Sequence, residues 1–526
     1  MSDLIAPDLE AASAAVHLAQ GVIDGAIAAA KAAGGVEENQ VVAYDLAHAA
    51  SAVAIARSSL TYGEKGPIEA LLACAFVADA LRDLGQRFLG REALFGTTPE
   101  WMGPSAAFVT TFADPRFLAS LAGEAGPSHL DESFELVADT FHRFAEEQVR
   151  PRAEHIHRHN GDIPEDLIES LAEIGGLGLS VPESYGGFAS GGKEDYIGMV
   201  VATEALTWGS LGIGGSLITR PEILTRALVN GGTEDQKNRW LPKLATGEIL
   251  AAVAVTEPDF GSDVAGLTTS ATKTEEGWVI NGTKTWCTFG ARANVLMLLA
   301  RTDPDRSKAH RGLSLFVVEK PVGEGHGFSF EQDGGGKMEG RPIDTIGYRG
   351  MHSYEIAFDG WLVPEENLVG GDQGIGRGFY LQMAGFENGR IQTAARAIGI
   401  MQAAYEAALS YANERVVFGA PIIEFQLTQA KLTRMAVIIQ ACRQYSLEVA
   451  QLMAVGEGSL EASMAKAYVC RAAEWVTREA MQIHGGMGYA EEYPVSRYFV
   501  DARVLSIFEG ADETLCLKVI ARRLLG

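Results

Sequence analysis

Residues 277–289, "GWVINGTKTWCTF", mark the point where the texture of the chain changes from helical to β. Between two apparent strands this stretch holds Asn281-Gly282, a dipeptide typical of a two-residue hairpin turn. Three short apolar runs bounded by turn residues follow it, "NVLMLLAR", "LSLFVVEK" and "SYEIAFDGWLVP". We therefore expect a β domain over residues 249–366, with a hairpin that turns at Asn281-Gly282.

The residues on both sides of this domain have helical patterns. The first part is rich in Ala, Leu and Val, and "GPSHLDES" (126–133) is typical of a linker into a new helix. We predict an α+β protein, mainly α, and not a nucleotide-binding βαβ array. Its four parts are an N-terminal helical extension (1–128), a helical domain (129–248), the β domain (249–366) and a C-terminal helical bundle (367–526).

The composition is that of a soluble globular protein with an excess of acid. The 526 residues include 43 basic and 68 acidic side chains, for a formal net charge of -25. This charge argues against a nucleic-acid or anionic-membrane partner, because no overall basic field attracts phosphate. The five cysteines are scattered, without zinc-site spacing, so we expect buried thiols and no metal. With no basic signal, Arg-rich presequence or apolar run of membrane length, we expect a cytoplasmic protein.

Two segments of the β domain suit a flat polar ligand. The segment "VAVTEPDFGSDVAG" (253–266) offers hydroxyls and close backbone amides, although alone it fits a plain polar loop better. Trp286 and Thr288 stand two apart on a predicted strand, which places them on one face. An aromatic plane beside a hydroxyl suits a heteroaromatic ring. For Trp286 alone, a position in the core is the simpler interpretation.

The C-terminal part offers a second set of polar groups. "YANERVVFGAPIIEFQ" (411–426) holds Arg415, and "QIHGGMGYAEEYPVSRYFVDARV" (482–504) holds Gly485-Gly486. An arginine with a Gly-rich backbone suits a pyrophosphate. Taken singly, Arg415 also suits a surface ion pair, and His484 suits a packed histidine better than a ligand.

Six motifs occur in a fixed order: TEPxxGSD, TWxT, ENGR, ERxxFGxPIxxFQ, QxHGGxGY and FEG. In combination they make residues 130–526 resemble the acyl-CoA dehydrogenase family. The resemblance implies a helical domain, a central β domain and a C-terminal four-helix bundle, with FAD as cofactor. It also implies α,β-dehydrogenation of an acyl-CoA thioester.

The resemblance further implies which residues contact FAD. Trp286 would pack on the isoalloxazine and Thr288 would hydrogen-bond near N5. The implied residues of the C-terminal part would reach the FAD of a neighbouring subunit; they are Arg415, Phe418, Gln426, Gln482, Gly485 and Gly486. The family commonly has Thr-x-Gln after FEG, where this chain has Ala511-Asp512-Glu513. The full implied set is Val255, Thr256, Gly261, Ser262, Trp286, Thr288, Arg415, Phe418, Gln426, Gln482, Gly485, Gly486, Ala511 and Glu513.

Glu509, in "SIFEGADETL" (506–515), matches the catalytic base of the family. The α-proton of a thioester is a very weak acid, so its removal needs a positioned carboxylate. Some members carry the base on an earlier helix, immediately before the arginine of ENGR, but that position here is Gly389. The resemblance implies that the CoA substrate is bound by Ser262, Glu387, Arg390 and Gly510.

Within the family, the N-terminal extension, together with "ITRPEI" (218–223) and residues 333–353, is similar to members that act on a short branched dicarboxylyl-CoA. The free carboxylate of such a substrate needs a cation in the pocket. Arg220 is the candidate, and the alternative is that it faces solvent or a partner subunit. A glutaryl-CoA-type or short branched-chain acyl-CoA dehydrogenase is the main alternative. A less favoured acyl-CoA oxidase and, from another class, a non-catalytic flavin-binding scaffold also stay open.

The resemblance also sets the expected partners. Electron-transferring flavoprotein is the expected electron acceptor. The N-terminal extension is predicted to pack over the usual dimer–dimer face of the family, which favours a homodimer over a tetramer.

Overall fold

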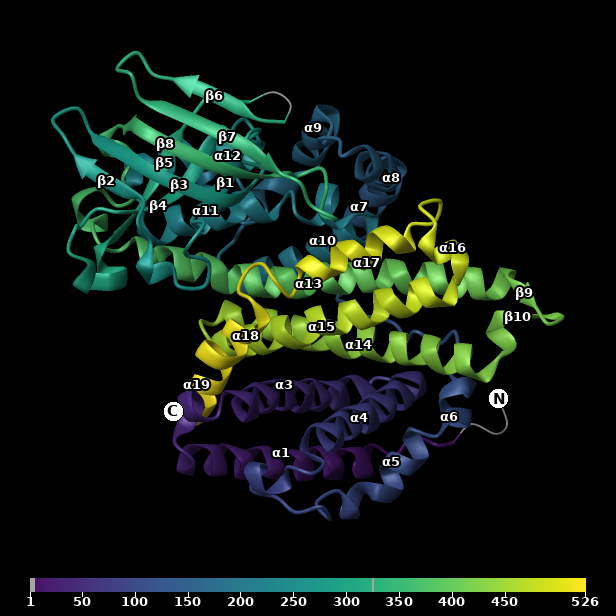
Figure 1. Cartoon of the computed structure of the whole chain (residues 1–526). Helices are drawn as coiled ribbons and strands as arrows, with labels where there is room; N and C mark the ends of the chain where they lie inside the picture. Colours follow the sequence, from purple (N-terminus) through teal and green to yellow (C-terminus); the bar gives the residue numbers. More distant parts are fainter. Residues whose placement is uncertain (1–4, 324–325) are drawn as a thin grey trace. The chain divides into compact units, whose positions relative to one another are not determined.

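The structure, a computed structural model, describes residues 5–323 and 326–526, apart from the side chain of Arg220. The chain divides into two compact units. Unit 1 comprises residues 1–136 and 393–526, and unit 2 comprises residues 137–392. Unit 2 holds one large sheet and unit 1 is helical apart from a short two-stranded hairpin (Figure 1), which confirms the predicted α+β class, mainly α.

One mixed sheet forms the centre of unit 2. Its strand order is β1-β4-β2-β3-β8-β7-β6, and β5 pairs with the other edge of β4. β4 and β5 are buried at nearly every position, which explains why their sequences are continuous apolar runs. The strands are β1 (Ala251–Ala254), β2 (Ser270–Lys273), β3 (Trp278–Thr288), β4 (Val295–Arg301), β5 (Leu313–Glu319), β6 (Phe328–Glu331), β7 (Lys337–Ile343) and β8 (Ser353–Val363).

The hairpin predicted at Asn281-Gly282 is wrong. β3 passes through this dipeptide without turning, and the chain turns earlier, where the Thr274 N–H donates to the Gly277 carbonyl at 2.7 Å. At Gly282 the pairing between β3 and β8 shifts register, with a φ of 140°. A β-bulge and a tight turn both use the conformational freedom of glycine, so the Asn-Gly signal fits either.

A second register shift in β3, between Lys284 and Cys287, changes the expected position of Trp286. Trp286 has a φ of 57°, and its side chain is 55% exposed while Thr288 is buried. The bulge therefore breaks the simple alternation that placed these two residues on one face. It also shows that Trp286 is not a core tryptophan.

Helices cover the sheet of unit 2 through two separate buried clusters. Leu296, Leu298 and Ala300 of β4 belong to one cluster with residues of α7 to α10, whereas alternate residues Val295 and Met297 belong to the other with α11 and α12. Each face of the sheet therefore has its own core. The helices are α7 (Glu132–Phe144, which begins in unit 1), α8 (Arg150–His159), α9 (Glu165–Glu173), α10 (Lys193–Gly209), α11 (Thr219–Gly231), α12 (Glu234–Thr246) and short turns η3 (Ala145–Val149), η4 (Gly176–Gly178), η5 (Glu183–Tyr185), η6 (Leu211–Gly215), η7 (Val264–Gly266), η8 (Arg306–Gly312), η9 (Glu365–Asn367) and η10 (Gly371–Gly374).

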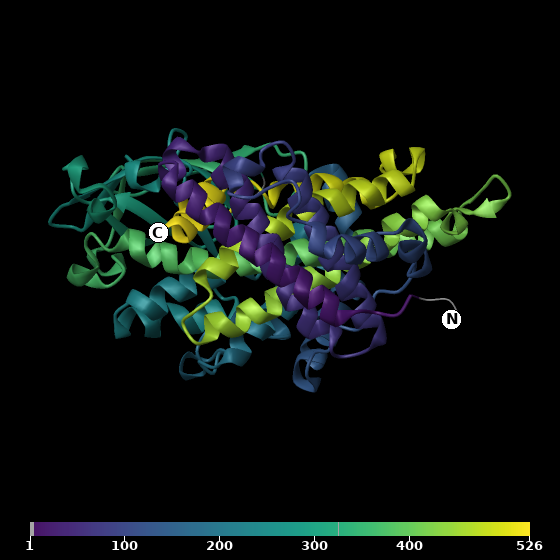
Figure 2. The same cartoon turned by 90° about the horizontal axis from the view of Figure 1, so that it is seen from below.

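Unit 1 combines helices from the two ends of the chain. α3 packs against α14 and α15, and α4 packs against α14, so the purple and blue helices lie against the green and yellow ones (Figures 1 and 2). Side chains of α14 fix the contact, since Thr433 donates to the Leu118 carbonyl at 2.6 Å and Arg434 pairs with Asp79 at 3.0 Å. The N-terminal extension is thus an integral part of this unit.

Unit 1 has an N-terminal and a C-terminal half, each made of several helices and short turns. The N-terminal half consists of α1 (Leu9–Ala32), α2 (Gly35–Glu38), α3 (Gln40–Gly63), α4 (Pro67–Phe88), η1 (Glu92–Phe95), η2 (Gly103–Ser105), α5 (Ala106–Phe112) and α6 (Pro115–Ser120). The C-terminal half consists of α13 (Gly378–Glu414, which begins in unit 2), β9 (Val416–Val417), β10 (Ala420–Pro421), η11 (Ile422–Glu424), α14 (Gln426–Ala454), α15 (Ser459–Ile483), α16 (Gly486–Tyr489), α17 (Val495–Val504), α18 (Asp512–Thr514), η12 (Leu515–Ile520) and α19 (Ala521–Leu525). All five cysteines are free and buried, as predicted.

α1 is the one helix in the described part of the chain that is long and apolar enough, by length and composition, to cross a membrane. We expected no apolar stretch of that length. Its buried residues, among them Ala12, Ala15, Val16 and Ala19, recur at spacings of three and four, and α1 packs against α3 and α4. This spacing is that of one packed face of a helix in a folded protein.

The bulge in β3 predicts that Gly282 tolerates no side chain. In Gly282→Ala, the new Cβ would lie 2.7 Å from Thr269 Oγ1 and 2.8 Å from its Cα, in addition to the strain of the positive φ. We expect a loss of about 2–4 kcal/mol in the free energy of unfolding, from overpacking and strain together. Gly335→Ala is the control, because Gly335 also has a positive φ but no atom lies within 4 Å of its Cβ position. Thermal unfolding of both variants should show the larger fall in Tm for Gly282→Ala, and equal falls would contradict the bulge.

Candidate active site

A buried ion pair in unit 2 fixes the loop that the first motif predicts as a ligand-binding loop. The Lys284 amine, on β3, donates to Glu257 Oε1 and to the Val255 carbonyl, both at 2.9 Å. Lys284 is 0% exposed and Glu257 is 3% exposed. The Glu257 carboxylate in turn accepts from the backbone N–H groups of Thr268 and Thr269, both at 2.8 Å. One carboxylate thus joins the two ends of the loop to β3.

The environment of this pair shifts the pKa values of both groups. Burial opposes ionisation of Glu257, but the charge of Lys284 and the hydrogen bonds from Thr268 and Thr269 outweigh it and hold its pKa at about 2. Burial lowers the pKa of Lys284 to about 8, against the opposing effect of Glu257. Both groups are therefore charged near neutral pH, and the pair is structural.

The residues of unit 2 that were predicted to bind FAD fit a flavin. Trp286 presents an exposed indole at the bulge. Gly261 and Ser262 are exposed on the loop, Thr256 is half-buried and Val255 is buried. Thr288 is buried, and its hydroxyl hydrogen-bonds to that of Ser353 at 3.0 Å. An aromatic face beside hydroxyls and exposed loop backbone matches the ring and polar edge of a flavin.

The substrate residues on α13 lie beside a polar cluster that sequence reasoning missed. Glu387 and Arg390 are half-buried and three residues apart, which places them on neighbouring positions of the helix surface. Glu222 of α11 is 2% exposed and accepts from Asn388 at 3.3 Å, Gln392 at 2.7 Å and Arg226 at 3.2 Å. Burial raises the pKa of Glu222, although Arg226 opposes this.

Two residues of this cluster stand in segments that the sequence analysis singled out for other reasons. Glu222 stands in the same "ITRPEI" segment that made Arg220 a candidate, and Asn388 stands inside ENGR. A buried glutamate cannot be told from a surface one without its partners, and two of these, Asn388 and Gln392, lie on α13. The side chain of Arg220 itself lies outside the described residues.

Glu509 stands at the apex of a short loop in unit 1. It is half-buried and has a φ of 53°, a left-handed conformation that is uncommon for a residue with a side chain. The loop is closed by the Asp512 N–H, which donates to the Ser506 carbonyl at 3.0 Å. The buried Lys466 of α15 donates to the Gly510 carbonyl at 2.6 Å. A strained residue held from both sides is typical of a functional position.

The packing beside Glu509 comes from α13. The guanidinium of Arg396, which is fully buried, lies 4.7 Å from the centre of the Phe508 ring. Gly389, the alternative position for a base, is a buried helical glycine. It has no side chain that could remove a proton.

The residues predicted to reach a neighbouring subunit lie at one end of unit 1. α13 ends there at the β9–β10 hairpin, and Tyr411 of α13 stacks on His484 beside α16, with ring centres 4.3 Å apart. His484 is buried, as the packed-histidine interpretation predicted. At this end Phe418 is 99% exposed, and further exposed positions are Arg415, Gln426, Gln482, Gly485 and Gly486.

The three residues after FEG differ in their exposure to solvent. Ala511 is half-buried and Glu513 is exposed, whereas Asp512 is buried and accepts hydrogen bonds from two residues of α3, Tyr44 and His48. The departure from the family pattern at this point therefore coincides with a contact to the N-terminal extension.

Comparisons with known proteins agree with these features. Three family profiles match the chain: "Acyl-CoA dehydrogenase, N-terminal domain" at residues 131–248, "middle domain" at 252–361 and "C-terminal domain" at 376–525. A (2S)-methylsuccinyl-CoA dehydrogenase from Cereibacter sphaeroides is 47% identical over 76% of this chain and 71% of its own length.

Two solved structures share the fold. Butyryl-CoA dehydrogenase from Megasphaera elsdenii is 32% identical, with a TM-score of 0.68 over 76% of this chain and 99% of that one. A glutaryl-coenzyme A dehydrogenase in complex with glutaryl-CoA is 29% identical, with a TM-score of 0.69 over 76% of this chain and 96% of that one.

The Lys284–Glu257 pair predicts that removing one of the two charges destabilises the fold strongly, whereas removing both destabilises it little. Lys284→Met leaves the buried Glu257 carboxylate without its cation, so we expect a loss of about 3–5 kcal/mol in the free energy of unfolding. Lys284→Met with Glu257→Gln leaves no buried charge and should recover most of that loss. Thermal unfolding and the ratio of bound FAD to protein are the measurements. A single variant as stable as the wild type would contradict this account.

The pKa of Glu257 also predicts how acid acts on this loop. Because that pKa lies at about 2, below the ordinary 4.5, the carboxylate stabilises the fold fully above pH 4.5. This contribution is lost as the pH falls from 4.5 toward 2. Glu257→Gln lacks the group that titrates, so its Tm should fall less steeply than that of the wild type over the accessible part of this range. Parallel curves would show that Glu257 does not carry this acid sensitivity.

Proposed function

Because the chain belongs to the acyl-CoA dehydrogenase family, we propose that it oxidises (2S)-methylsuccinyl-CoA, a short branched dicarboxylyl-CoA, to mesaconyl-CoA. The family assignment makes the protein an FAD-dependent acyl-CoA dehydrogenase. The choice of substrate is supported by the 47% identity to a (2S)-methylsuccinyl-CoA dehydrogenase. Such a reaction belongs to the ethylmalonyl-CoA pathway, and we place it in the cytoplasm.

The observation that carries the mechanism is the conformation of Glu509. The left-handed backbone of Glu509, at the apex of a closed loop with a buried lysine on the next carbonyl, fixes the position from which its side chain extends. We propose that it removes the α-proton of the thioester as a general base. The β-hydrogen leaves with its electron pair as hydride, and a C=C bond forms between the two carbons. FAD, when bound, supplies the acceptor for that hydride.

The other residues have binding and orienting roles in this proposal. Ser262, Glu387, Arg390 and Gly510 bind the CoA thioester, and the backbone N–H of Glu509 stabilises the negative charge that develops on the thioester oxygen. Trp286 and the loop fixed by Glu257 hold the flavin. These assignments follow the family motifs onto the matching positions of this chain.

The distal carboxylate of methylsuccinyl-CoA needs a positive partner in the acyl pocket. We propose Arg220 for this role. The nearby Arg226 is a poorer candidate, because its charge is already matched by Glu222 at 3.2 Å. If this assignment is right, Arg220→Ala should weaken the binding of (2S)-methylsuccinyl-CoA far more than the binding of a neutral acyl-CoA of equal length.

A glutaryl-CoA-type activity is the second candidate. It is favoured by the structural similarity to a glutaryl-coenzyme A dehydrogenase, with a TM-score of 0.69. Glutaryl-CoA also carries a distal carboxylate, so the same pocket chemistry would serve. A non-catalytic flavin-binding scaffold is the candidate of another class, and the FEG setting of Glu509 argues against it.

We further propose two partners. Electron-transferring flavoprotein would reoxidise the flavin. A second copy of the chain would cover the exposed apolar side chains at the hairpin end of unit 1, where Phe418 and Tyr489 are 99% and 84% exposed. We favour a homodimer, with a tetramer as the alternative.

The substrate is tested by anaerobic titration of the FAD-loaded protein with (2S)-methylsuccinyl-CoA, beside butyryl-, isobutyryl- and glutaryl-CoA. We expect fast loss of flavin absorbance with (2S)-methylsuccinyl-CoA. Bleaching by a different thioester alone would replace the substrate and keep the mechanism. No bleaching by any of the four, with FAD bound, would favour the scaffold.

The base is tested by Glu509→Gln, which keeps the shape of the side chain and removes the proton acceptor. We expect flavin reduction to slow by about 10²–10⁴-fold, the usual contribution of a general base, with FAD content unchanged. Glu492→Gln is the control, since Glu492 is an exposed carboxylate in the loop before α17, at the other end of that helix from Glu509. Full activity in Glu509→Gln would rule out Glu509 as the base.

A further inference from the structure

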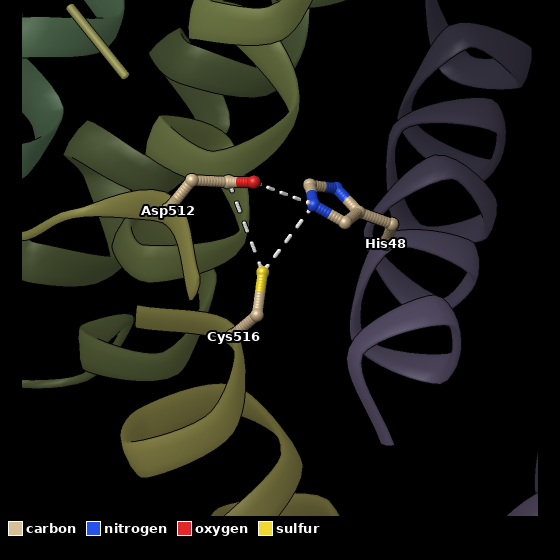
Figure 3. Close-up of side chains that lie close together, drawn as sticks. All are labelled: His48, Asp512 and Cys516. Atoms are coloured by element: carbon tan, nitrogen blue, oxygen red, sulfur yellow. Dashed lines mark hydrogen bonds and ion pairs between the residues drawn. The ribbon is translucent and has the colours of Figure 1, made fainter. Parts of the chain in front are cut away.

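Three residues past Glu509, the Asp512 carboxylate lies in a cluster with Tyr44 and His48 of the N-terminal extension and with Cys516. Figure 3 shows His48, Asp512 and Cys516. The Asp512 Oδ2 atom accepts a hydrogen bond from the Tyr44 hydroxyl at 2.5 Å and from His48 Nε2 at 3.1 Å. The Cys516 thiol approaches Asp512 Oδ1 at 3.9 Å and His48 Nε2 at 3.4 Å. Tyr44 and His48 are on α3, more than 460 residues away along the chain.

Three members of the cluster are shielded from solvent, and Tyr44 is half-buried. His48 is 2% exposed, Cys516 is 0% exposed and Asp512 is 7% exposed. Burial lowers the pKa of His48 and raises that of Cys516, so both are neutral near pH 7. Burial also opposes ionisation of Asp512, but the hydrogen bonds from His48 and Tyr44 hold its pKa below the ordinary value. The buried carboxylate thus accepts from two neutral donors, and the charged Arg471 lies behind one of them, donating to the Tyr44 hydroxyl at 3.3 Å.

The His, Asp and Cys atoms are close enough together to hold a metal ion. Hydrogen bonding already accounts for their arrangement, however, because the same carboxylate oxygen accepts from both Tyr44 and His48. The Tyr44 contact of 2.5 Å is a strong charge-assisted hydrogen bond. We therefore interpret the cluster as a hydrogen-bonded anchor.

The anchor lies at one end of the Glu509 loop. The Asp512 N–H closes the loop on the Ser506 carbonyl, while Lys466 holds the Gly510 carbonyl from α15. Glu509 has a left-handed backbone, which persists only where the surroundings fix it. The side chain of Asp512 links this loop directly to α3.

We propose that the N-terminal extension positions the catalytic base: Tyr44 and His48 hold Asp512, and Asp512 holds the loop that carries Glu509. Tyr44, His48 and Asp512 are positioning residues, since they act through the loop. This inference rests on the proposed function of Glu509. It gives the extension a role in the chemistry of the enzyme, in addition to its role in the packing of unit 1.

A second contact between the extension and the C-terminal segment provides a matched control. Glu37 accepts from Lys518 at 2.9 Å and from Arg522 at 2.7 Å, and all three side chains are about half exposed. This contact ties the extension to η12 and α19 without touching residues 506–512. Glu37→Gln therefore weakens the attachment of the extension and leaves the anchor of the Glu509 loop intact.

The test compares FAD-loaded Tyr44→Phe, His48→Ala, His48→Gln and Glu37→Gln with the wild type. One measurement is the rate of flavin reduction by (2S)-methylsuccinyl-CoA, with kcat, KM and the isotope effect of α-deuterated substrate. The other is amide hydrogen exchange of residues 506–515, which needs no substrate. In His48→Ala we expect kcat to fall about 10- to 100-fold, as a misplaced catalytic group does, with little change in KM. The α-deuterium isotope effect should rise, because proton removal becomes slower.

His48→Ala should also show faster amide hydrogen exchange at residues 506–515 than the wild type. His48→Gln should recover much of the activity, because its amide can donate from a similar position. Tyr44→Phe should show the same defects as His48→Ala, and Glu37→Gln should match the wild type in both measurements.

The outcomes separate this inference from the proposed function. If the wild type reduces its flavin and His48→Ala and Tyr44→Phe equal it in kcat and exchange, the positioning role is overturned. If Glu37→Gln is impaired to the same extent, attachment of the extension alone explains the effect and the role of Asp512 is overturned. A stoichiometric metal lost on His48→Ala would replace the anchor with a metal site. If no thioester reduces the wild-type flavin, the proposed function fails, and exchange at residues 506–515 still decides whether the anchor holds the loop.

Discussion

The ion pair of Lys284 and Glu257 is the constraint on which the binding face of unit 2 depends. The lysine ties the first residues of the loop to β3, and the glutamate gathers the far end of the loop through two backbone N–H groups. A buried pair of this kind is weak evidence for stability, because desolvation offsets most of the attraction. Its value lies in geometry: each hydrogen bond of the carboxylate excludes another conformation of the loop. The bulge that exposes Trp286 begins at Lys284, so the loop and the indole share one support.

Much of the fold could be predicted from local patterns, and the failures have a common cause. Apolar runs correctly indicated the buried strands β4 and β5, since strands buried on both faces need no alternation. Asn281-Gly282 was misinterpreted because a bulge and a turn both use the conformational freedom of glycine. The difference lies in β8, which pairs with β3 but is more than seventy residues further along the chain. Trp286 was uncertain for the same reason, because a bulge depends on the partner strand.

The candidate site divides along similar lines. Glu509 could be assigned because its motif is contiguous and its chemistry depends on one side chain. The buried cluster around Glu222 could not be found, since two of its donors come from α13 and the sequence gives no sign of which carboxylates are buried. Asp512 was seen only as a departure from a family pattern. Its partners on α3 come from the part of the chain that the family motifs do not cover, so no comparison of motifs could supply them. Arg220 stays a prediction.

The composition of unit 1 from the two ends of the chain sets an order for synthesis on the ribosome. Residues 1–136 emerge first, but their partners α14 and α15 emerge only after the whole of unit 2. At about 5–20 residues per second, the intervening segment takes roughly 13–50 s to make. During that interval the apolar faces of α3 and α4 have no C-terminal helices to cover them. Early helices of this kind are natural clients for a chaperone that binds nascent chains, and a C-terminal truncation would leave them exposed permanently.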